Sequence, residues 1–369
     1  MLQRFVGLLS QNTPLNAIFP GRSSSSDISF SEAPDIEDLR GMNDEEFLRY
    51  SRPQLEELEV IRQEKYALYK KRRTIAMPLA ATLGPLLAYV DYWLLWLQSS
   101  NDDSAAGLSV AFLGGLYAWV TSPKRQYASA YKNEILPKLA NLFGRFTYTP
   151  NGQIPVHLMQ PSKILPAHDR YESEDHFIGK YKEVGIQFCE IDLKQRRRSN
   201  KRTYYVTIFK GLAVLLDMSK KRFYGHTILD KDRGKISEWF VSRSHGLKKA
   251  NMVDPEFEKL FDAYTDDQVE ARYLIDPLMI EKLKGLYEEY NGEKMVAAFY
   301  DSKMLILISS KHNHFEPADI SVPATDPESV LNMKREIGQV LSIIDQLDLY
   351  DPRKVEEARA REGAASAVH

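Results

Sequence analysis

The sequence predicts an α+β cytoplasmic domain with an antiparallel or mixed sheet, anchored by a two-helix transmembrane hairpin. Two long apolar runs, 75–97 and 105–120, lie back to back near the first third of the chain. Further on, strand-like segments mostly precede two helical patterns, and one pair of strands is joined by a hairpin signal. Strands grouped before helices are typical of α+β folds, whereas the apolar runs are typical of membrane spans.

We divide the chain into six segments along these lines. Residues 22–35 hold a run of four serines, and the apolar run at 5–9 is short, so the first 42 residues are expected to form a disordered tail. The remaining segments are a charged amphipathic helix, the transmembrane hairpin, a juxtamembrane helix, the cytoplasmic domain and a disordered C-terminal tail, at 43–73, 74–122, 123–146, 147–349 and 350–369.

The two apolar runs differ in how easily they cross a bilayer. The first has 23 residues and reaches roughly 34 Å as a helix, enough for a hydrocarbon core of about 30 Å. The second has 16 residues and reaches about 24 Å, so it needs Thr121 and Ser122 or a locally thinner bilayer. The alternative is a helical hairpin buried in a soluble core.

Charge sets the expected orientation of the hairpin. Its outer ends are basic, whereas the short loop between the runs carries Asp102 and Asp103. The positive-inside rule therefore places both termini in the cytoplasm and the protein in the inner membrane as a two-span protein. The residues expected to meet anionic lipid headgroups are Lys70, Lys71, Arg72, Arg73, Lys124 and Arg125.

Small residues recur every four positions in both runs, a spacing that lets helix backbones approach closely in lipid. They are Ala80, Gly84 and Ala88 in the first run, and Gly107, Ala111 and Gly115 in the second. We interpret these stripes as the contact surface between the two helices. The alternative is that they also mediate contact between copies in a homo-oligomer. Asp91, the ionisable residue inside the first run, is interpreted as structural or interfacial, with an ion or proton path as the alternative.

The amino-acid composition argues against one class of partner and against an internal disulfide. Lys and Arg number 49 against 51 Asp and Glu, for a net charge of −2, which argues against nucleic acid as a partner. The single cysteine, Cys189, excludes an internal disulfide and is expected to be a buried small hydrophobe.

Local signals place the elements of the cytoplasmic domain. Asp276-Pro277 and Asp326-Pro327 are expected to open two amphipathic helices, because Asp caps a helix and Pro fits its first turn. The proline-rich stretch 147–167 is expected to be a loop. The predicted strands are 185–193, 203–217, 223–229, and the hairpin pair 295–299 and 304–309.

A basic run between the first two of these strands is expected to be an exposed loop. It contains Arg196, Arg197 and Arg198, and a second basic cluster lies at 220–222. We weigh a solvated loop, contact with the membrane surface, and nucleic-acid binding. The last is disfavoured because neither cluster interleaves stacking aromatics.

Motifs of known chemistry are missing from the sequence. It has no phosphate-binding glycine loop with Lys-Ser/Thr, no nucleophile elbow and no His-Glu-x-x-His. His312-x-His314 would need further ligands to bind a metal, and Glu316 and Asp319 are weak candidates for them. We therefore interpret this segment as a solvated loop. We therefore expect no catalytic, cofactor-binding or metal residues, and no cofactor.

Several segments in a fixed order carry a family resemblance. They are Glu174-Asp175 with Gly179, Phe188-x-Glu190, 208–212, Phe223-x-Gly225-x-Thr227, 254–259 with Phe261, and 266–274 followed by Pro277. In these segments the chain resembles the bacterial membrane-protein family catalogued as domain of unknown function 3137, from about Tyr127 to Leu347. The resemblance implies no activity, but it implies a LemA-type membrane protein as a partner.

Two classes of function follow. The first is a membrane-anchored interaction or scaffold protein whose α+β domain is the binding module. The second is a membrane-bound enzyme whose site is not recognisable by motif, and a minor component of a transport complex is a further alternative. A closed pocket with perturbed acids would favour the enzyme, and a flat apolar or basic face would favour the scaffold.

Overall fold

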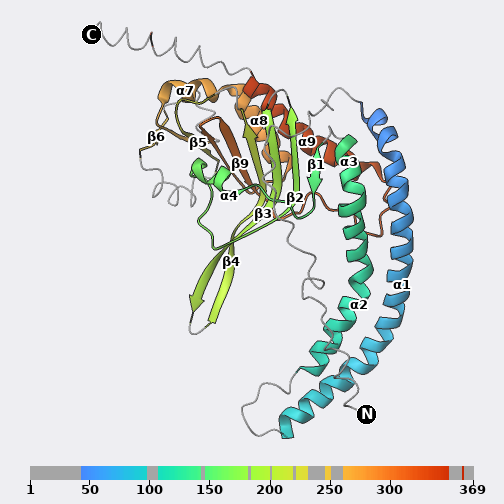
Figure 1. Ribbon diagram of the computed structural model, residues 1–369. Coiled ribbons are helices and arrows are strands. Elements are labelled where there is room, and N and C mark those ends of the chain that lie inside the picture. Colours follow the sequence, from blue (N-terminus) through green and yellow to red (C-terminus); the bar gives the residue numbers. More distant parts are fainter. Residues whose placement is uncertain are drawn as a thin grey trace, which may run out of the picture.

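A long helical hairpin stands beside an α+β domain (Figure 1). The computed structural model describes residues 43–97, 107–142, 146–181, 184–199, 202–218, 222–231, 246–250 and 261–348, together with Ala360. The expected N-terminal tail, the loop between the apolar runs and, apart from Ala360, the expected C-terminal tail lie outside the described residues.

The first helix of the hairpin, α1, is continuous from Asp44–Leu97 and passes through Pro53, Pro78 and Pro85. The expected boundary between a charged helix and a first span therefore falls inside one element. The second helix, α2, covers Leu108–Ala130 and runs directly into a π-helical turn, η6, at Tyr131–Ile135, and then into α3 at Leu136–Leu142. The helical hairpin and the domain are thus joined by uninterrupted helix.

The described part of the domain is built on one nine-stranded sheet in which every pair of neighbours is antiparallel. This confirms the α+β class and selects the antiparallel alternative. The order across the sheet is β1-β2-β3-β4-β9-β8-β5-β7-β6. The strands are β1 Thr147–Thr149, β2 Arg170–Tyr181, β3 Val184–Ser199, β4 Arg202–Asp217, β5 Thr227–Asp230, β6 Lys248–Lys249, β7 Asp262–Thr265, β8 Lys294–Tyr300 and β9 Lys303–Ser309.

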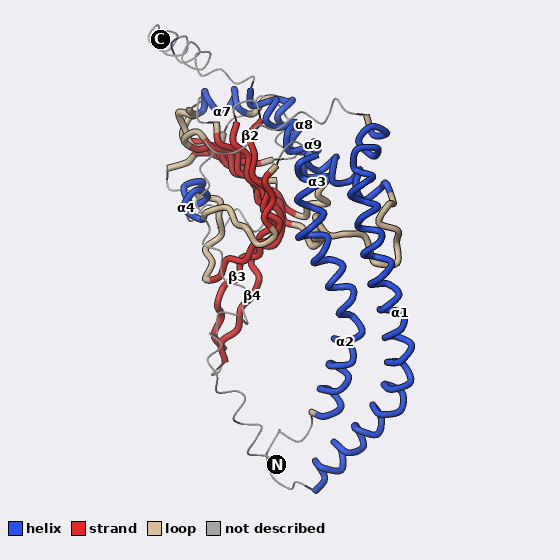
Figure 2. Tube along the Cα trace, turned by 45° about the vertical axis from the view of Figure 1, so that its right-hand side comes forward, coloured by secondary structure: helices blue, strands red, loops and turns tan. Residues whose placement is uncertain are grey.

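Helices cover the sheet unequally. On one face lie α3, α8 at Pro277–Glu289 and α9 at Pro327–Asp348, over a core that also takes in the start of α1. On the other face lie the short α4 at Val156–Met159 and the 3-10 turn η7 at Gln160–Ser162 (Figure 2). The remaining helix, α7, covers Gln268–Leu274 at the far end of the domain.

Elements with strong local signals form where they were predicted. Asp276 caps α8, its carboxylate accepting a hydrogen bond from the Met279 backbone N–H at 2.7 Å. The strands β8 and β9 pair directly across a turn in which Asp301 takes a positive φ of 51°. Cys189 is buried, as expected.

Other predictions of local structure were wrong. The stretch 147–167 is not a plain loop, because it contains β1, α4 and η7. The strand expected at 223–229 begins only at Thr227. The strand β2 was missed because polar side chains dominate its first half, which lies at a bulge between Glu174 and Phe177 and so breaks the expected alternation.

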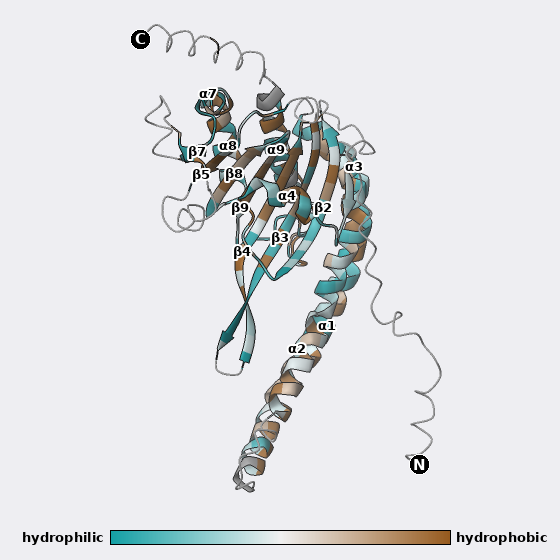
Figure 3. Ribbon diagram, turned by 60° about the vertical axis from the view of Figure 1, so that its left-hand side comes forward, coloured by the Kyte–Doolittle hydropathy of each residue, from teal (hydrophilic) through white to brown (hydrophobic). Residues whose placement is uncertain are grey.

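The basic run after residue 193 is strand rather than loop, which corrects the expectation from the sequence. The last pairing of β2 with β3 is at Lys194, and the pairing of β9 with β4 begins at Gly211. Beyond these points β3 and β4 pair only with each other, so that 195–199 and 202–209 form a two-stranded ribbon that projects from the sheet. Figure 3 shows the hydrophilic end of this ribbon.

Candidate functional site

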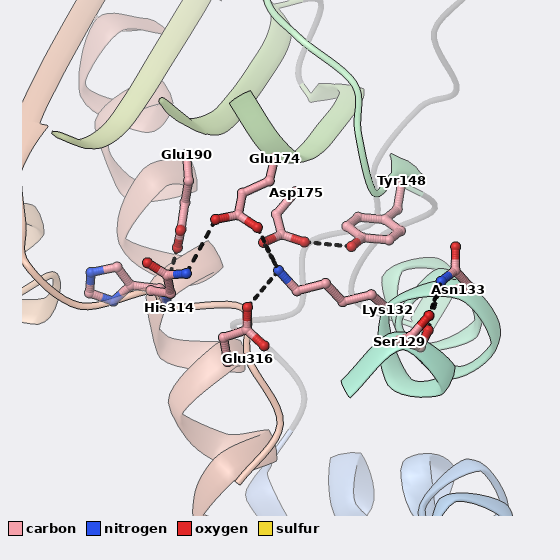
Figure 4. Close-up of polar contacts among 10 residues, drawn as sticks. Ser129, Lys132, Asn133, Tyr148, Glu174, Asp175, Glu190, His314 and Glu316 are labelled. Carbon is pink, nitrogen blue, oxygen red and sulfur yellow. Dashed lines mark hydrogen bonds and ion pairs between the residues drawn. The ribbon is translucent and has the colours of Figure 1, made fainter. Parts of the chain in front are cut away.

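Lys132 brings together three carboxylates where the helical hairpin meets the sheet. Its Nζ lies 2.7 Å from Asp175, 2.7 Å from Glu316 and 3.0 Å from Glu174 (Figure 4). We call these three acids the acidic cluster. Lys132 belongs to the π-helical turn η6, and such turns are frequent at functional sites because the wider turn redirects a side chain. Its neighbours Tyr131 and Ile135 are buried in the core.

Asp175 is the most deeply placed member of the acidic cluster. It is fully buried and takes a left-handed φ of 56° at the bulge of β2, a conformation that Asp tolerates better than most residues. Tyr148 donates a hydrogen bond to its carboxylate at 2.5 Å. Burial raises the pKa of Asp175 to about 6, even though Lys132 and Tyr148 both act to lower it.

The acidic cluster has the composition of a divalent-cation site. One carboxylate oxygen from each of the three acids lies within 4.8 Å of the others, and this is the sole such group within the described ranges. The ammonium of Lys132, however, contacts all three acids and occupies the position that a cation would take. The cluster is therefore partly neutralised by the chain itself.

A second buried acid lies next to the cluster on β3. Glu190 is the register partner of Glu174 and accepts a hydrogen bond from the His314 backbone N–H at 2.5 Å. Burial raises the pKa of Glu190 to about 7. An acid with such a pKa exchanges its proton near neutral pH, as a general acid or base requires.

Glu190 lines a hollow of about 310 Å³ that we call the acidic hollow. Gly211 contributes to its wall and has a φ of 150°; a Cβ there would lie 2.0 Å from the backbone oxygen of Ile308, so only glycine fits. The lining holds four carboxylates, one lysine and one histidine, which are Glu172, Glu174, Glu190, Asp192, Lys210 and His312. The hollow therefore favours a small cationic or polar ligand.

The histidines and acids considered from the sequence as metal ligands do not converge. His314 uses both ring nitrogens, Nδ1 to Glu336 at 3.2 Å and Nε2 to Ser310 Oγ at 3.0 Å. Glu316 contacts Lys132, and Asp319 pairs with Lys124 at 3.0 Å. His312 lines the acidic hollow instead. The four side chains thus belong to different local networks.

The basic residues that flank the apolar runs gather at one level of the helical hairpin. Arg72 reaches from α1 to α2, donating to the Trp119 backbone oxygen at 2.8 Å and to Ser122 Oγ at 3.0 Å. Arg125 donates to the Ala118 backbone oxygen at 2.9 Å. Lys70, Lys71 and Arg73 are exposed on α1, whereas Lys124 is partly covered by its contact with Asp319.

Within the hairpin, Asp91 joins the two helices. Its carboxylate accepts hydrogen bonds from the backbone N–H of Leu108 and of Ser109, and from Ser109 Oγ at 2.6 Å. Asp91 therefore satisfies orphan donors at the start of α2 and attracts the positive end of its dipole.

The small-residue stripes do not all face the partner helix. Gly84 is buried, and a Cβ there would lie 3.6 Å from Leu113, whereas Ala80 is half-buried. Ala88, Ala111 and Gly115 are exposed, and Gly107 is half-buried just before α2. The stripe on α1 thus contributes to the contact with α2 at Ala80 and Gly84, whereas most of the stripe on α2 is turned away from α1.

Sequence reasoning missed the acidic cluster. Its acids come from β2 and from the segment after β9, and Lys132 comes from η6, so no local spacing connects them. The available signal was a lysine between apolar helix positions, Lys132, and a pair of adjacent acids, Glu174-Asp175, inside a strand. In both patterns a charged side chain lies next to positions that are expected to be buried, and a buried charge needs an ionic partner.

Comparison with known proteins gives a family match over part of the chain. The family model described as Protein of unknown function (DUF3137) matches residues 207–349. The resemblance expected from the sequence is confirmed, over a shorter range than about 127–347. No curated protein matches.

Among solved structures, the chain matches the crystal structure of the mycobacterial trehalose monomycolate transport factor A, TtfA. The identity is 10%, the match covers 56% of this chain and 92% of that chain, and the TM-score is 0.28. A superposition this poor supports no statement about shared architecture or function.

Proposed function

We propose that this chain is a membrane-anchored interaction protein, in which α1 and α2 hold the α+β domain at the cytoplasmic face of the membrane. The observation that carries the proposal is the apolar surface of the helical hairpin. Large exposed side chains run along both helices; they are Ile75, Met77, Leu79, Leu83, Leu86, Tyr89, Tyr92 and Trp93 on α1, and Leu108, Val110, Leu113, Tyr117 and Trp119 on α2. Contiguous apolar surface of this kind marks contact with lipid or protein.

One helix among the described residues, α1, is long and apolar enough to cross a membrane. Only 17% of its apolar stretch is buried, which sets it apart from the core helix of a soluble protein. We infer that α2 is a second, shorter span. The basic residues at the outer ends of both apolar runs support a topology with both termini in the cytoplasm.

The cytoplasmic half of α1 is fixed to the domain, which supports a role in presenting that domain rigidly. Glu59 and Arg62 form an ion pair at 2.6 Å, and Arg62 lowers the pKa of Glu59 to about 2. Arg62 donates to the Ile320 backbone oxygen at 2.7 Å, and Glu59 accepts from the Ala324 N–H at 2.7 Å. A rigid link suits a module that must meet a membrane partner, for which the family resemblance suggests a LemA-type protein.

Alkaline carbonate extraction of membranes tests the anchor. The full chain should stay in the pellet, and Leu83→Arg with Leu86→Arg should release it, because each arginine in a span costs about 3 kcal/mol. The control is Leu278→Arg with Val322→Arg, two similarly exposed apolar residues outside the hairpin. Release of the unmodified chain, or equal release of both double variants, would contradict the anchor.

Partner identification tests the interaction role. The full chain should be purified in mild detergent after cross-linking in the membrane, and co-purifying proteins identified by mass spectrometry. We expect a stoichiometric membrane protein. Recovery of the chain by itself, with the carbonate test positive, would count against the interaction role and leave the anchor standing.

The acidic hollow favours a membrane-bound enzyme as a second candidate function. A recess with an acid that titrates near pH 7 is a common feature of catalytic sites. A panel of ester, phosphoester and peptide substrates should then show turnover that Glu190→Gln abolishes and Glu172→Gln, on the exposed rim, retains. Turnover unaffected by Glu190→Gln would exclude this site.

A further inference from the structure

We propose that the projecting ribbon, residues 195–199 and 202–209, docks on the anionic headgroups of the membrane leaflet next to the basic residues that flank the two apolar runs. This rests on the proposed anchor and adds a second membrane contact made by the domain itself.

The ribbon is built unlike the rest of the sheet. The inner parts of β3 and β4 are buried, whereas residues 196–199 and 202–208 are all exposed. A two-stranded ribbon with both faces in water is marginal in stability, and its outer backbone edges lack ladder partners among the described strands. A ribbon of this kind gains stability when another surface covers it.

Its side chains match the interface of an anionic bilayer. The segment 195–209 contains no acidic residue, and none of the guanidinium groups of Arg196, Arg197, Arg198 and Arg202 forms an ion pair with a carboxylate among the residues described; the Arg196 backbone N–H donates to Asp169 Oδ2 at 2.8 Å. The register sets Tyr205 opposite Arg196 and Tyr204 opposite Arg197. Tyrosine prefers the headgroup level, and arginine near anionic lipid is attracted to it.

The ribbon extends far enough toward the membrane. It leaves the sheet in the same direction in which α1 and α2 run away from the domain (Figures 1 and 2). Lys132 meets Glu174, the register partner of Glu190, so helix and strand share a starting level. From there Arg198 lies about 26 Å along β3, whereas Lys124 lies about 12 Å back along α2. The arginines therefore reach at least the level of the basic flank.

Two other occupants fit less well. A protein strand adding to the free edge of β4 would use backbone hydrogen bonds and would not need the arginines. Nucleic acid would use both arginine and tyrosine, since the register brings aromatic side chains to the basic run after all. The lipid surface is favoured because the proposed anchor holds it next to the ribbon, on the side toward which the ribbon projects.

The experiment measures the distance of the ribbon from lipid in the full chain. Thr203→Cys, on the exposed ribbon, is labelled with a fluorophore in nanodiscs that contain lipids with a headgroup nitroxide quencher. Native Cys189 does not compete for the label, because it is fully buried and burial raises the pKa of its thiol to about 12. Lys248→Cys, exposed on β6 at the far edge of the sheet, is the control position.

We expect strong quenching at position 203 in nanodiscs of phosphatidylcholine with phosphatidylglycerol, and little at 248. Arg196→Gln, Arg197→Gln and Arg198→Gln together should weaken the binding of the ribbon to anionic lipid roughly 100-fold, at about fivefold for each arginine, and so reduce the quenching at position 203. The control triple Lys248→Gln, Lys284→Gln and Lys311→Gln removes the same charge from exposed sites and should leave quenching unchanged.

Quenching at 203 as low as at 248, or equal in neutral and anionic nanodiscs, would overturn the proposal. So would shielding of the label by an added protein or RNA without lipid quenching. Failure of the chain to enter nanodiscs at all would instead contradict the anchor, so the two failures are distinguishable.

Discussion

Replacing the buried acid Glu190 by its neutral isostere is expected to stabilise the domain at neutral pH. Glu190 is 5% exposed, and burial raises its pKa from 4.5 to about 7. The folded state therefore binds the proton more tightly than the unfolded chain, so stability falls as pH rises from 4.5 to about 7. Glutamine at this position mimics the protonated acid and still accepts the hydrogen bond from the His314 N–H.

The expected size follows from the two pKa values. A rise from 4.5 to about 7 corresponds to about 3 kcal/mol in total, of which about 2 kcal/mol falls between about pH 5.5 and pH 7.5. Asp175 and Glu336, whose pKa values burial also raises, add to the effect with the same sign. Glu174, Asp175 and the His314 ring are titratable groups that face Glu190, and Glu172, Asp192, Lys210 and His312 line the same hollow.

Thermal unfolding of the full chain in detergent, at about pH 5.5 and pH 7.5, measures the effect. For a domain of this size, about 2 kcal/mol corresponds to roughly 4–8 °C, so the unmodified chain should melt higher at the lower pH. Glu190→Gln should raise the melting temperature at pH 7.5 and flatten the pH dependence. Glu172→Gln, an exposed acid on the same hollow, should change it by little. If the melting temperature of Glu190→Gln fell between pH 5.5 and pH 7.5 as much as that of the unmodified chain, the reasoning would be refuted.

Three further outcomes can be measured in the same way. Lys132→Met should destabilise the domain by about 3 kcal/mol at pH 7.5 and by less at pH 5.5, where buried Asp175 takes up a proton instead; an equal loss at both pH values would contradict this. Asp91→Ala should loosen the start of α2 by about 1 kcal/mol, seen as faster proteolysis of the hairpin in detergent, whereas Asp91→Asn should lose less. Gly211→Ala should lower the melting temperature by several degrees, because its Cβ meets the Ile308 backbone oxygen, whereas Gly114→Ala, in α2 with no heavy atom within 4 Å of the added Cβ, should stay close to the unmodified chain.

The sequence was informative where structure is decided locally. The β8–β9 turn and the Asp-Pro openings of α8 and α9 each depend on a few adjacent residues, and all three form where they were predicted. The strand β2 was invisible because its polar residues are explained by partners distant in sequence, such as Lys132 for Asp175. The arginine run was mistaken for a loop because charge density usually marks loops, whereas here pairing with Tyr204 and Tyr205 keeps it in a strand.

The candidate site was beyond sequence reasoning for the same physical reason. An ion pair between Lys132 and Glu316 joins residues 184 positions apart, and the register between Glu174 and Glu190 depends on a bulge. Neither follows from periodicity. One local signal, a lysine in a helical turn with apolar positions at Tyr131 and Ile135, was not used in the prediction.

Charge is separated along a single strand, and this connects the acidic hollow to the ribbon. In β3, Glu190 is buried beside Glu174 and Asp175, and Arg196–Arg198 are exposed about 20–26 Å further along. An anionic surface attracts the arginine end and repels the acidic end, so the two effects turn the domain in the same sense. The contact of the ribbon with lipid orients the domain, and the ion pair of Glu59 with Arg62, which also bonds the Ile320 backbone, holds the domain on α1. Both contacts therefore act on the same domain. Weakening either contact alone should therefore change the tilt of the domain less than weakening both, which tilt-sensitive fluorescence in nanodiscs can measure.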